Sequence, residues 1–366
     1  LYILSGLLLT KFVTLNQVLE LSQVGIAFLV FIYGVKFSTT KLKSVADRGA
    51  LASAFSIIGT TALSVPAALL LGLQQVEIIV FAAASALSSS LIGLELISDD
   101  LRKELVHSRI IESIQLIQDL VAVVLMLLLF SSTSGNSLIY GSLIFLMAFA
   151  FKRGFTYFAE SFRDSTEVIM VFSLGTLALF VSTSIIFEIS PVVGAFAAGL
   201  ALSRYPYSLE IVDTVGTLKD FFTVILFVSL GAIAATANLT VLLTAGVITA
   251  FTMLVNPFII YSSLRSTQEN SRISFFTGLG LDQVSEFAVV IAIQAYLLGQ
   301  IPLNLLQSVV VATALTMTVS SYTTRYEQKL YGIFSKLFNT DEKLESTVEE
   351  PQDHIILIGF DTQGKK

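Results

Sequence analysis

Polar side chains interrupt a hydrophobic run near the first third of the chain. The run begins at Ile111 and reads IESIQLIQDLVAVVLMLLLF, and its polar members are Glu112, Gln115, Gln118 and Asp119. Four polar residues are spaced by four, three and four positions and therefore share one face of an α-helix: Ser108, Glu112, Gln115 and Asp119. A carboxylate inside a membrane costs on the order of 3 kcal/mol on insertion scales and normally faces a cavity or a partner. The stripe predicts an ion or proton path that reaches Asp119; the alternative is a protonated Asp119 that only hydrogen-bonds to a neighbouring helix.

Two other hydrophobic segments are interrupted by small and polar residues. ALSSSLIGLEL begins at Ala86, and GLGLDQVSEF begins at Gly278. Such residues permit an unwound backbone whose free carbonyl groups and helix ends can bind an ion, provided that the break is buried in protein. For SSSLIG alone, ordinary packing of small residues is the alternative. The residues expected to support the second break are Asp282, Gln283, Ser285 and Glu286.

The elements that must position these residues are membrane-spanning helices. Hydrophobic residues make up 54% of the 366 residues and charged residues only 13%, well below the roughly 25% of a soluble domain. Because a helix needs about 20 mostly apolar residues to cross a bilayer, the pattern predicts twelve spans. They are residues 1–13, 19–37, 49–72, 77–97, 110–130, 136–155, 167–187, 190–204, 217–236, 239–263, 273–298 and 303–323.

The distribution of cations orients these spans. Lys and Arg concentrate on the cytoplasmic side of membrane helices, and all but Lys11 of the 21 Lys and Arg residues lie in the gaps after even-numbered spans or in the tail. Those gaps and the C-terminus are therefore predicted to be cytoplasmic. The fifth span then enters from the cytoplasm, with Asp119 about 10 Å deeper than Glu112 at 1.5 Å per residue. Glu112 and Gln115 are accordingly expected to line a cytoplasmic funnel.

A cation and a proton could compete for Asp119, because a carboxylate must release its proton before it binds a cation. Alkali cations take oxygen ligands. Besides Asp119, these could come from the Gln118 amide, from unwound carbonyl groups and from three hydroxyl groups, those of Ser88, Ser89 and Ser90. Spans three to five and ten to twelve begin on opposite sides of the membrane, as an inverted repeat requires.

The two ends of the chain allow further predictions about its domain organisation. The abrupt start, LYILSGLLL, indicates a missing N-terminal helix. Residues 1–325 are the expected membrane domain and 326–353 a cytoplasmic linker. Residues 354–366 read HIILIGFDTQGKK, an apolar strand followed by glycines that is typical of a truncated start of a Rossmann-like nucleotide-binding domain. Asp361 stands at the middle glycine position of that pattern, so a simple turn is the alternative.

Little in the sequence favours enzymatic chemistry. The chain has no Cys, which excludes disulfides and metal thiolates, and its two His residues, His107 and His354, lie at a membrane edge and in the tail. We expect no catalytic residue and no enzyme.

Four motifs together resemble the monovalent cation:proton antiporters of the second family, especially the Kef-type potassium:proton exchangers. ALSSSLIGLEL is similar to A-L-S-S-T-A-I-A-M-Q, IQDLV to F-Q-D-I-A, SPVVGAFAAGLALS to S-x-x-x-G-A-F-x-A-G, and LDQVSEFAVV to G-Q-G-S-E-F-A-F-V. The tail HIILIGFDTQG resembles the start of the regulatory nucleotide-binding domain of this family. The resemblance covers essentially the whole chain, with the motifs in the same order.

The resemblance implies an all-α, sodium/proton antiporter-like fold with about twelve transmembrane helices, inverted repeats, a dimerisation scaffold and a moving core with two crossed broken helices. It implies that Asp119 is the shared carrier of cation and proton and that Gln118 is a cation ligand. A Gln-Asp pair is typical of the potassium exchangers, whereas sodium exchangers tend to carry Asn-Asp or Asp-Asp.

This sequence also departs from the pattern of the family. Asn256 stands where the family often has a Lys, thirty residues ahead of Glu286. Lys36 replaces a usual Glu, and Val284 replaces the second Gly of G-Q-G-S-E-F. Glu112 and Gln115 replace residues that are apolar in the Kef type. These changes leave the antiporter class unchanged and leave the ion and the stoichiometry open.

The expected function is antiport of a monovalent cation, K⁺ before Na⁺, for H⁺ by alternating access in the inner membrane of the cell. The expected partners are these ions, the lipid bilayer and a second copy in a homodimer, with no nucleic acid. No cofactor is expected in the membrane domain, whereas NAD(H) or AMP could bind the missing cytoplasmic domain. The alternatives are a channel, a carrier of an organic solute, or a transport-inactive sensory protein of the same fold.

Overall fold

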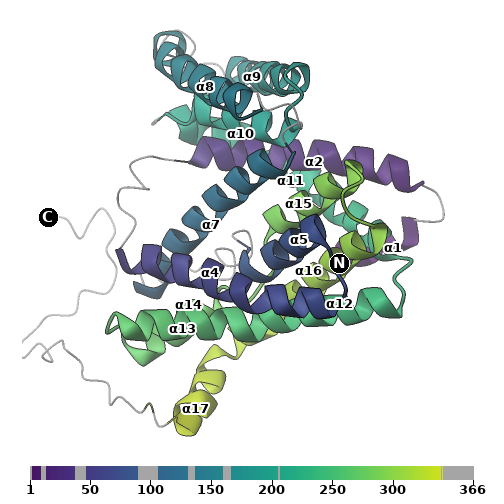
Figure 1. The fold of residues 1–366 in the computed structure, drawn as a ribbon. Coiled ribbons are helices and arrows are strands. Elements are labelled where there is room, and N and C mark those ends of the chain that lie inside the picture. Colours follow the sequence, from purple (N-terminus) through teal and green to yellow (C-terminus); the bar gives the residue numbers. More distant parts are fainter. Residues whose placement is uncertain are drawn as a thin grey trace, which may run out of the picture. The chain divides into compact units, whose positions relative to one another are not determined.

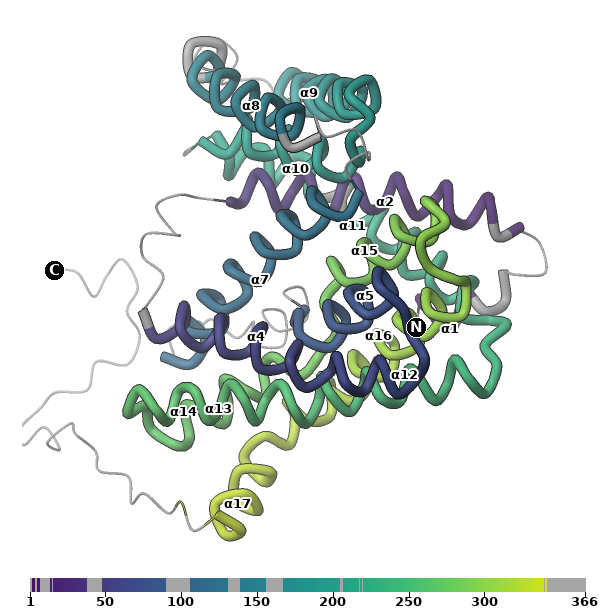
Figure 2. Tube along the Cα trace, viewed as in Figure 1, coloured from purple at the N-terminus to yellow at the C-terminus, as the bar shows by residue number. Residues whose placement is uncertain are grey.

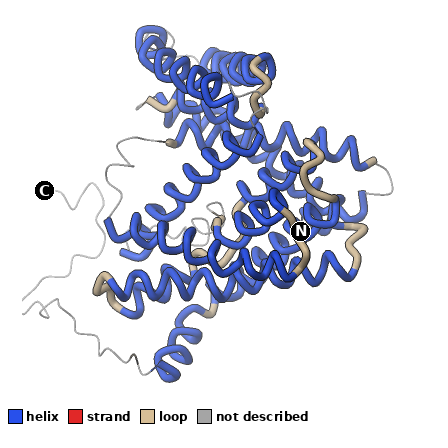
Figure 3. Tube along the Cα trace, in the orientation of Figure 1, coloured by secondary structure: helices blue, strands red, loops and turns tan. Residues whose placement is uncertain are grey.

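The fold was analysed in a computed structural model. It describes residues 2–9, 14–37, 47–89, 106–130, 137–159, 166–204, 207–338 and 340. The chain divides into two compact units, Leu1–Glu327 and Gln328–Lys366. In the described residues the secondary structure is helical, apart from one isolated β-bridge (Figure 3).

Each of the twelve expected spans contains a helix, and the all-α prediction is confirmed (Figure 1). The first seven spans correspond to α1 (Tyr2–Leu9), α2 (Leu15–Lys36), α4 (Asp47–Leu70), α5 (Gln75–Ala86), α7 (Val106–Phe130), α8 (Ser137–Ala159) and α9 (Thr166–Ile186). The last five correspond to α10 (Pro191–Leu202), α11 (Tyr207–Ala234), α12 to α13 (Leu239–Ala250, Asn256–Ser266), α14 and α15 (Ser271–Leu279, Glu286–Leu297) and α16 (Leu303–Arg325).

In the part of the chain that the structure describes, six helices are long and apolar enough to cross a membrane by themselves. They are residues 16–36, 48–70, 106–130, 167–186, 239–266 and 303–325. A bent pair within α11 makes a seventh if it is counted as one span, and α5, α10 and α15 are shorter apolar helices. Large apolar side chains such as Leu70 and Ile186 are 90% and 76% exposed. Exposed apolar surface on this scale indicates contact with lipid.

The helices of the membrane unit contact one another mainly within two groups (Figure 2). We call α1, α2 and α8 to α11 the scaffold bundle. The core bundle consists of α4, α5, α7 and α12 to α16. The helix contacts thus fall into two groups, as expected, while dimerisation by one group and movement of the other stay predictions. α7, which carries Asp119, lies in the core bundle.

Close helix contact within the scaffold bundle depends on glycine. A Cβ atom added at Gly199 of α10 would lie 2.1 Å from the Phe31 carbonyl oxygen of α2, and one added at Gly34 would lie 2.4 Å from the Phe196 carbonyl oxygen. Neither helix can therefore carry a larger residue at this crossing without moving apart. Small residues at such crossings are the usual means of helix association in membranes.

Both expected helix breaks are present at the positions that the small and polar residues indicate. α5 ends at Ala86, and its cap residue Leu87 is extended. In the second broken segment α14 ends at Leu279, and α15 begins after Ser285, whose hydroxyl oxygen accepts a hydrogen bond from the Phe287 N–H.

The two breaks cross and pair with each other. Ser88 and Val284 form an antiparallel β-bridge. The Ser89 N–H donates to the Gln283 carbonyl oxygen, and the Ser285 N–H donates to the Leu87 carbonyl oxygen, both at 3.1 Å. Buried backbone groups that a helix end leaves unpaired must find partners, and here each break supplies them to the other.

A π-helical turn, η1 (Phe251–Val255), joins α12 to α13. It directly precedes Asn256 and Pro257. Proline has no N–H to donate to the preceding turn, and a π turn before it is a common way to accommodate that loss.

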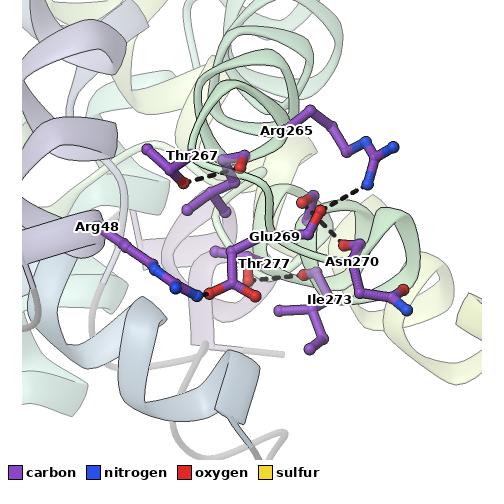
Figure 4. A network of polar contacts seen from close by, with 9 residues as sticks. Arg48, Arg265, Thr267, Glu269, Asn270, Ile273 and Thr277 are labelled. Carbon is purple, nitrogen blue, oxygen red and sulfur yellow. Dashed lines mark hydrogen bonds and ion pairs between the residues drawn. The ribbon is translucent and has the colours of Figure 1, made fainter. Parts of the chain in front are cut away.

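One ion pair ties α4 to the loop between α13 and α14 (Figure 4). Arg48 at the start of α4 pairs with Glu269, whose side chain is only 8% exposed. The Arg265 guanidinium also donates to the Glu269 backbone carbonyl oxygen at 2.6 Å. This salt bridge joins two elements of the core bundle at the end where the cations gather.

The region expected as a cytoplasmic linker, 326–353, is partly helical. α17 (Glu327–Phe338) begins two residues after α16 ends, and its sequence, EQKLYGIFSKLF, has a marked amphipathic pattern. The expected nucleotide-binding start at residues 354–366 lies outside the described residues, as does most of the remaining linker.

Candidate ion site

The side chain of Gln118 lies against the first break. Its Oε1 accepts a hydrogen bond from the Ser88 N–H at 2.9 Å, and its Nε2 donates to the Ala86 carbonyl oxygen at 3.4 Å and to the Ser56 hydroxyl at 3.3 Å. The residue is 1% exposed. The amide therefore fixes the end of α5 against α7, and one lone pair of Oε1 is already used in doing so.

Gln115, one turn earlier in α7, reaches the same break. Its Nε2 donates to the Ser89 carbonyl oxygen at 2.7 Å, and the side chain is 2% exposed. Its Oε1 is buried and accepts no hydrogen bond from the described residues. The structure thus places Gln115 at the break rather than on an open funnel surface, whereas Glu112, also assigned to the funnel, is exposed.

Asn256 connects the break to α4. Its Oδ1 accepts hydrogen bonds from the Ser56 hydroxyl at 2.6 Å and from the Thr60 hydroxyl at 3.2 Å, while its Nδ2 donates to the Ser88 hydroxyl at 3.1 Å. The Ser88 hydroxyl in turn donates to the Leu281 carbonyl oxygen at 2.9 Å. A neutral amide at the position of the usual Lys therefore holds both breaks and α4 together.

Two carboxylates lie close to the crossing. The Ser89 hydroxyl donates to Oε1 of Glu286, which is the first residue of α15 and is 3% exposed. A carboxylate at a helix N-terminus is stabilised by the dipole of the helix. Asp119 is partly exposed, and its carboxylate interacts electrostatically with that of Glu286. Asp119 therefore lies near the N-terminal end of α15, where Glu286 is placed.

Asp282 is held by hydroxyl groups of α16. The Ser320 hydroxyl donates to Oδ1 at 2.5 Å, and the Thr323 hydroxyl donates to Oδ2 at 2.8 Å. Gln283 donates from Nε2 to the Ser320 hydroxyl at 2.6 Å, and its own Oε1 is buried and accepts no hydrogen bond from any residue that the structure describes. The second break is thus bound to α16 through both of its polar side chains.

The structure therefore brings most of the expected site residues together around one crossing. Gln115, Gln118, Ser88, Ser89 and Asn256 form one hydrogen-bonded cluster, with Glu286 joined through Ser89. Asp282 and Gln283 belong to the same break but bind α16, and Ser285 caps α15. Ser90 lies outside the described residues.

Sequence reasoning missed two stripes of buried hydroxyl groups that complete this site. On α4 they are Ser53, Ser56, Thr60 and Ser64, and on α16 they are Thr313, Thr316 and Ser320, all of them 0% exposed. Steps of three and four residues place each stripe on one helix face. That spacing, in spans three and twelve, is the signal that could have identified the partners of Asn256 and Asp282.

Comparison with known families now decides the class of the protein. The model of a family described as the transmembrane sodium/hydrogen exchanger matches residues 1–326. The chain belongs to the sodium/hydrogen exchanger family. The family assignment expected from the motifs is thereby confirmed, and the cluster at the helix crossing is the polar centre of an exchanger-family membrane unit.

Relatives of this exchanger-family chain include named antiporters. It is 26% identical over 319 residues to the K(+) efflux antiporter 5 of Arabidopsis thaliana, covering 80% of this chain and 56% of that protein. It is 21% identical over 285 residues to the ammonium/H(+) antiporter subunit AmhT of Alkalihalophilus pseudofirmus, covering 74% of this chain and 73% of that protein. The K(+)/H(+) antiporter subunit KhtU of Bacillus subtilis is 22% identical over 62% of this chain and 59% of its own length. The chain thus spans only about half to three quarters of these relatives.

Solved structures support the same fold. The sodium proton antiporter MjNhaP1 from Methanocaldococcus jannaschii aligns over 90% of this exchanger-family chain and 89% of its own, with a TM-score of 0.63 and 15% sequence identity. At this identity the likeness shows the fold and not the transported ion.

Proposed function

We propose that this protein exchanges a monovalent cation for a proton across a membrane, with Asp119 as the group that binds either one. The observation that carries the proposal is the position of Asp119 beside Gln118, whose amide binds the end of the first broken helix. A titratable carboxylate at the junction of two interrupted helices is well placed to respond to ion binding, because helix ends and free carbonyl groups supply charge and ligands there.

The cation ligands are oxygen atoms around this junction. Asp119 supplies the negative charge. Gln115 Oε1 is a buried acceptor with no hydrogen bond from the residues in the described ranges, one helical turn from Asp119 on the same face. The second lone pair of Gln118 Oε1 and the Ser89 hydroxyl oxygen complete the set. A buried acceptor without a partner is costly, so a bound cation would remove that cost.

K⁺ is the preferred candidate for the cation. The named relatives include K(+) efflux antiporters and a K(+)/H(+) antiporter subunit. The Gln118–Asp119 pair also resembles the pattern of potassium exchangers. Na⁺ is the competing candidate, because the family model is that of sodium/hydrogen exchangers.

Exchange follows if the core bundle moves against the scaffold bundle only when Asp119 carries one of the two ions. Uphill movement of one ion then results from downhill movement of the other. Further parts of the proposal are an inner-membrane location, a cytoplasmic C-terminus, a homodimer, and a regulatory nucleotide such as NAD(H) or AMP on a domain beyond residue 353.

The test is reconstitution of the full chain in proteoliposomes that contain a pH-sensitive dye. Addition of K⁺ or Na⁺ outside should release protons from the lumen, with a larger signal for K⁺. The Asp119→Asn variant should be folded but should give no signal, because an amide of nearly the same shape cannot bind a proton in exchange for a cation. Full exchange in Asp119→Asn would sink the proposed carrier, and absence of exchange in the wild type with every alkali cation would sink the proposed function.

A further inference from the structure

An apolar pocket lies between the helix that carries Asp119 and the scaffold bundle. It has a volume of about 190 Å³ and is lined by ten residues from α7, α8, α10 and the end of α2. Nine of these side chains are apolar, and the tenth is Lys152 of α8. A dry cavity of roughly 150 Å³ is large enough to hold benzene, so this pocket can hold a segment of an aliphatic chain.

The pocket opens onto the apolar exterior of the membrane unit. Val124 of α7 and Phe149 of α8 line it and are 48% and 55% exposed. α7 is long and apolar enough to cross a membrane, and α8 covers the sixth of the expected spans, so we infer that these exposed apolar side chains face lipid. An acyl chain can therefore enter the pocket sideways from the bilayer without crossing a polar surface.

A cation lies beside the pocket, because Lys152 is one of its lining residues although the lining surface itself is almost entirely apolar. The Lys152 ammonium donates to the Ser203 hydroxyl at 2.8 Å, and Ser203 donates to the Leu200 carbonyl oxygen at 2.8 Å. Arg204 lies close enough to Lys152 for the two cations to repel each other. No carboxylate among the described residues lies within ion-pair distance of Lys152. A cation beside an apolar pocket, with a second cation close to it, favours an anion.

We propose that the pocket binds an anionic phospholipid of the surrounding leaflet, with one acyl chain between α7 and α8 and the phosphate at Lys152. Basic pockets between transmembrane helices on the cytoplasmic side are suited to anionic headgroups. The charge pattern of the chain places Lys152 and Arg204 on that side. The bound chain contacts both the core bundle, through α7, and the scaffold bundle, through α8 and α10.

Photolabelling of the full chain in nanodiscs tests the proposal. The probes are phosphatidylglycerol and phosphatidylcholine that carry the same diazirine group in one acyl chain, each diluted into unlabelled phosphatidylcholine. In the wild type, the peptides that contain residues 120–127 and 145–152 should be labelled several-fold more by phosphatidylglycerol. Equal labelling by the two lipids would mean that only ordinary boundary lipid is present and would overturn the proposal.

Matched variants separate the headgroup contact from the acyl-chain pocket. Lys152→Gln should reduce phosphatidylglycerol labelling about fivefold, the effect of one basic residue near an anionic surface, and should leave phosphatidylcholine labelling unchanged. Arg153→Gln removes the same charge from the exposed neighbouring residue, outside the pocket lining, and should change neither. An equal loss in both variants would show a general surface charge instead.

Val124→Trp tests the pocket itself. Its side chain should fill the mouth of the pocket and reduce labelling by both lipids, and because Val124 is half exposed the variant should fold. Unchanged phosphatidylglycerol labelling in Val124→Trp would overturn the placement of the acyl chain.

Discussion

The Asn256 amide nitrogen donates a hydrogen bond to the Ser88 hydroxyl at 3.1 Å, across the crossing of the two broken helices. In the resembling family this position often carries a Lys, whose charge can pair with the acidic site when no ion is bound. Here the group is neutral, and Ser56 and Thr60 of α4 hold its Oδ1. No built-in cation at this position would compete with a cation bound at the proposed site.

Exchange should therefore be electroneutral, one cation for one proton. A single carboxylate that carries either a proton or a monovalent cation moves the same net charge in both directions. The measurement is membrane current across a solid-supported membrane under a K⁺ gradient, with pH held equal on both sides. A steady, K⁺-dependent current that disappears in Asp119→Asn would refute this prediction. If Glu112→Gln abolished this current but kept cation-driven proton exchange, the exposed Glu112 would be identified as a second proton carrier.

Asn256→Ala should weaken both the fold and the exchange. The change removes the partner of three hydrogen bonds in a fully buried cluster, which costs on the order of 2 kcal/mol. The thermal unfolding midpoint should fall, and exchange at saturating K⁺ should fall with it. Asn238→Ala removes the N-cap of α12 at a cost of about 1 kcal/mol and should leave exchange intact. If exchange in the two variants were equal, Asn256 would have no role beyond stability.

Gln115→Leu should raise the K⁺ concentration needed for half-maximal exchange by about tenfold, the effect of one ligand contact worth about 1.4 kcal/mol. The matched control is Gln307→Leu, because Gln307 is equally buried and its Nε2 also donates to a backbone carbonyl oxygen, that of Ile233, at 2.9 Å. Both variants should be destabilised, but only Gln115→Leu should change the K⁺ dependence. If the K⁺ concentration for half-maximal exchange were the same in both variants, Gln115 would serve only to hold Ser89.

Gly199→Ala should destabilise the scaffold bundle by about 1–3 kcal/mol, the usual cost of overpacking. The added methyl group would lie 2.1 Å from a backbone oxygen of α2, which is well inside contact distance. An alanine at Gly246 in α12 meets nothing within 4 Å, so Gly246→Ala should be neutral or slightly stabilising. Apparent melting temperatures in detergent distinguish the two, and equal midpoints would show that α2 and α10 adjust freely.

The sequence alone was sufficient for the helices of the membrane unit. Runs of apolar residues are strong, local signals, so every expected span contains a helix. The cytoplasmic side assigned from Lys and Arg stays a prediction. The breaks at Ser88 and Asp282 were also predictable, because clustered small and polar residues in the middle of a span favour an unwound backbone. The amphipathic α17 was not predicted, since the acidic residues that follow it dominated the composition of the supposed linker.

The finer geometry of the site depends on contacts that no local pattern encodes. Gln115 shares the helical face of Glu112 and Asp119, which suggested a funnel, but its amide turns to the Ser89 carbonyl oxygen. The partners of Asn256 are about 200 residues distant in sequence. Helical periodicity identifies which residues share a face, whereas the packing of another helix decides whether that face is open.

The backbone pairing of Ser88 with Val284 also limits how the site can move. Because each break supplies the hydrogen-bonding partners of the other, neither interrupted helix can slide along its axis by itself without exposing peptide groups in a low-dielectric interior. The two breaks must therefore move together as one rigid unit. The amide protons of Ser89 and Ser285 should therefore exchange with deuterated solvent slowly and at similar rates, whichever side of the membrane the ion faces.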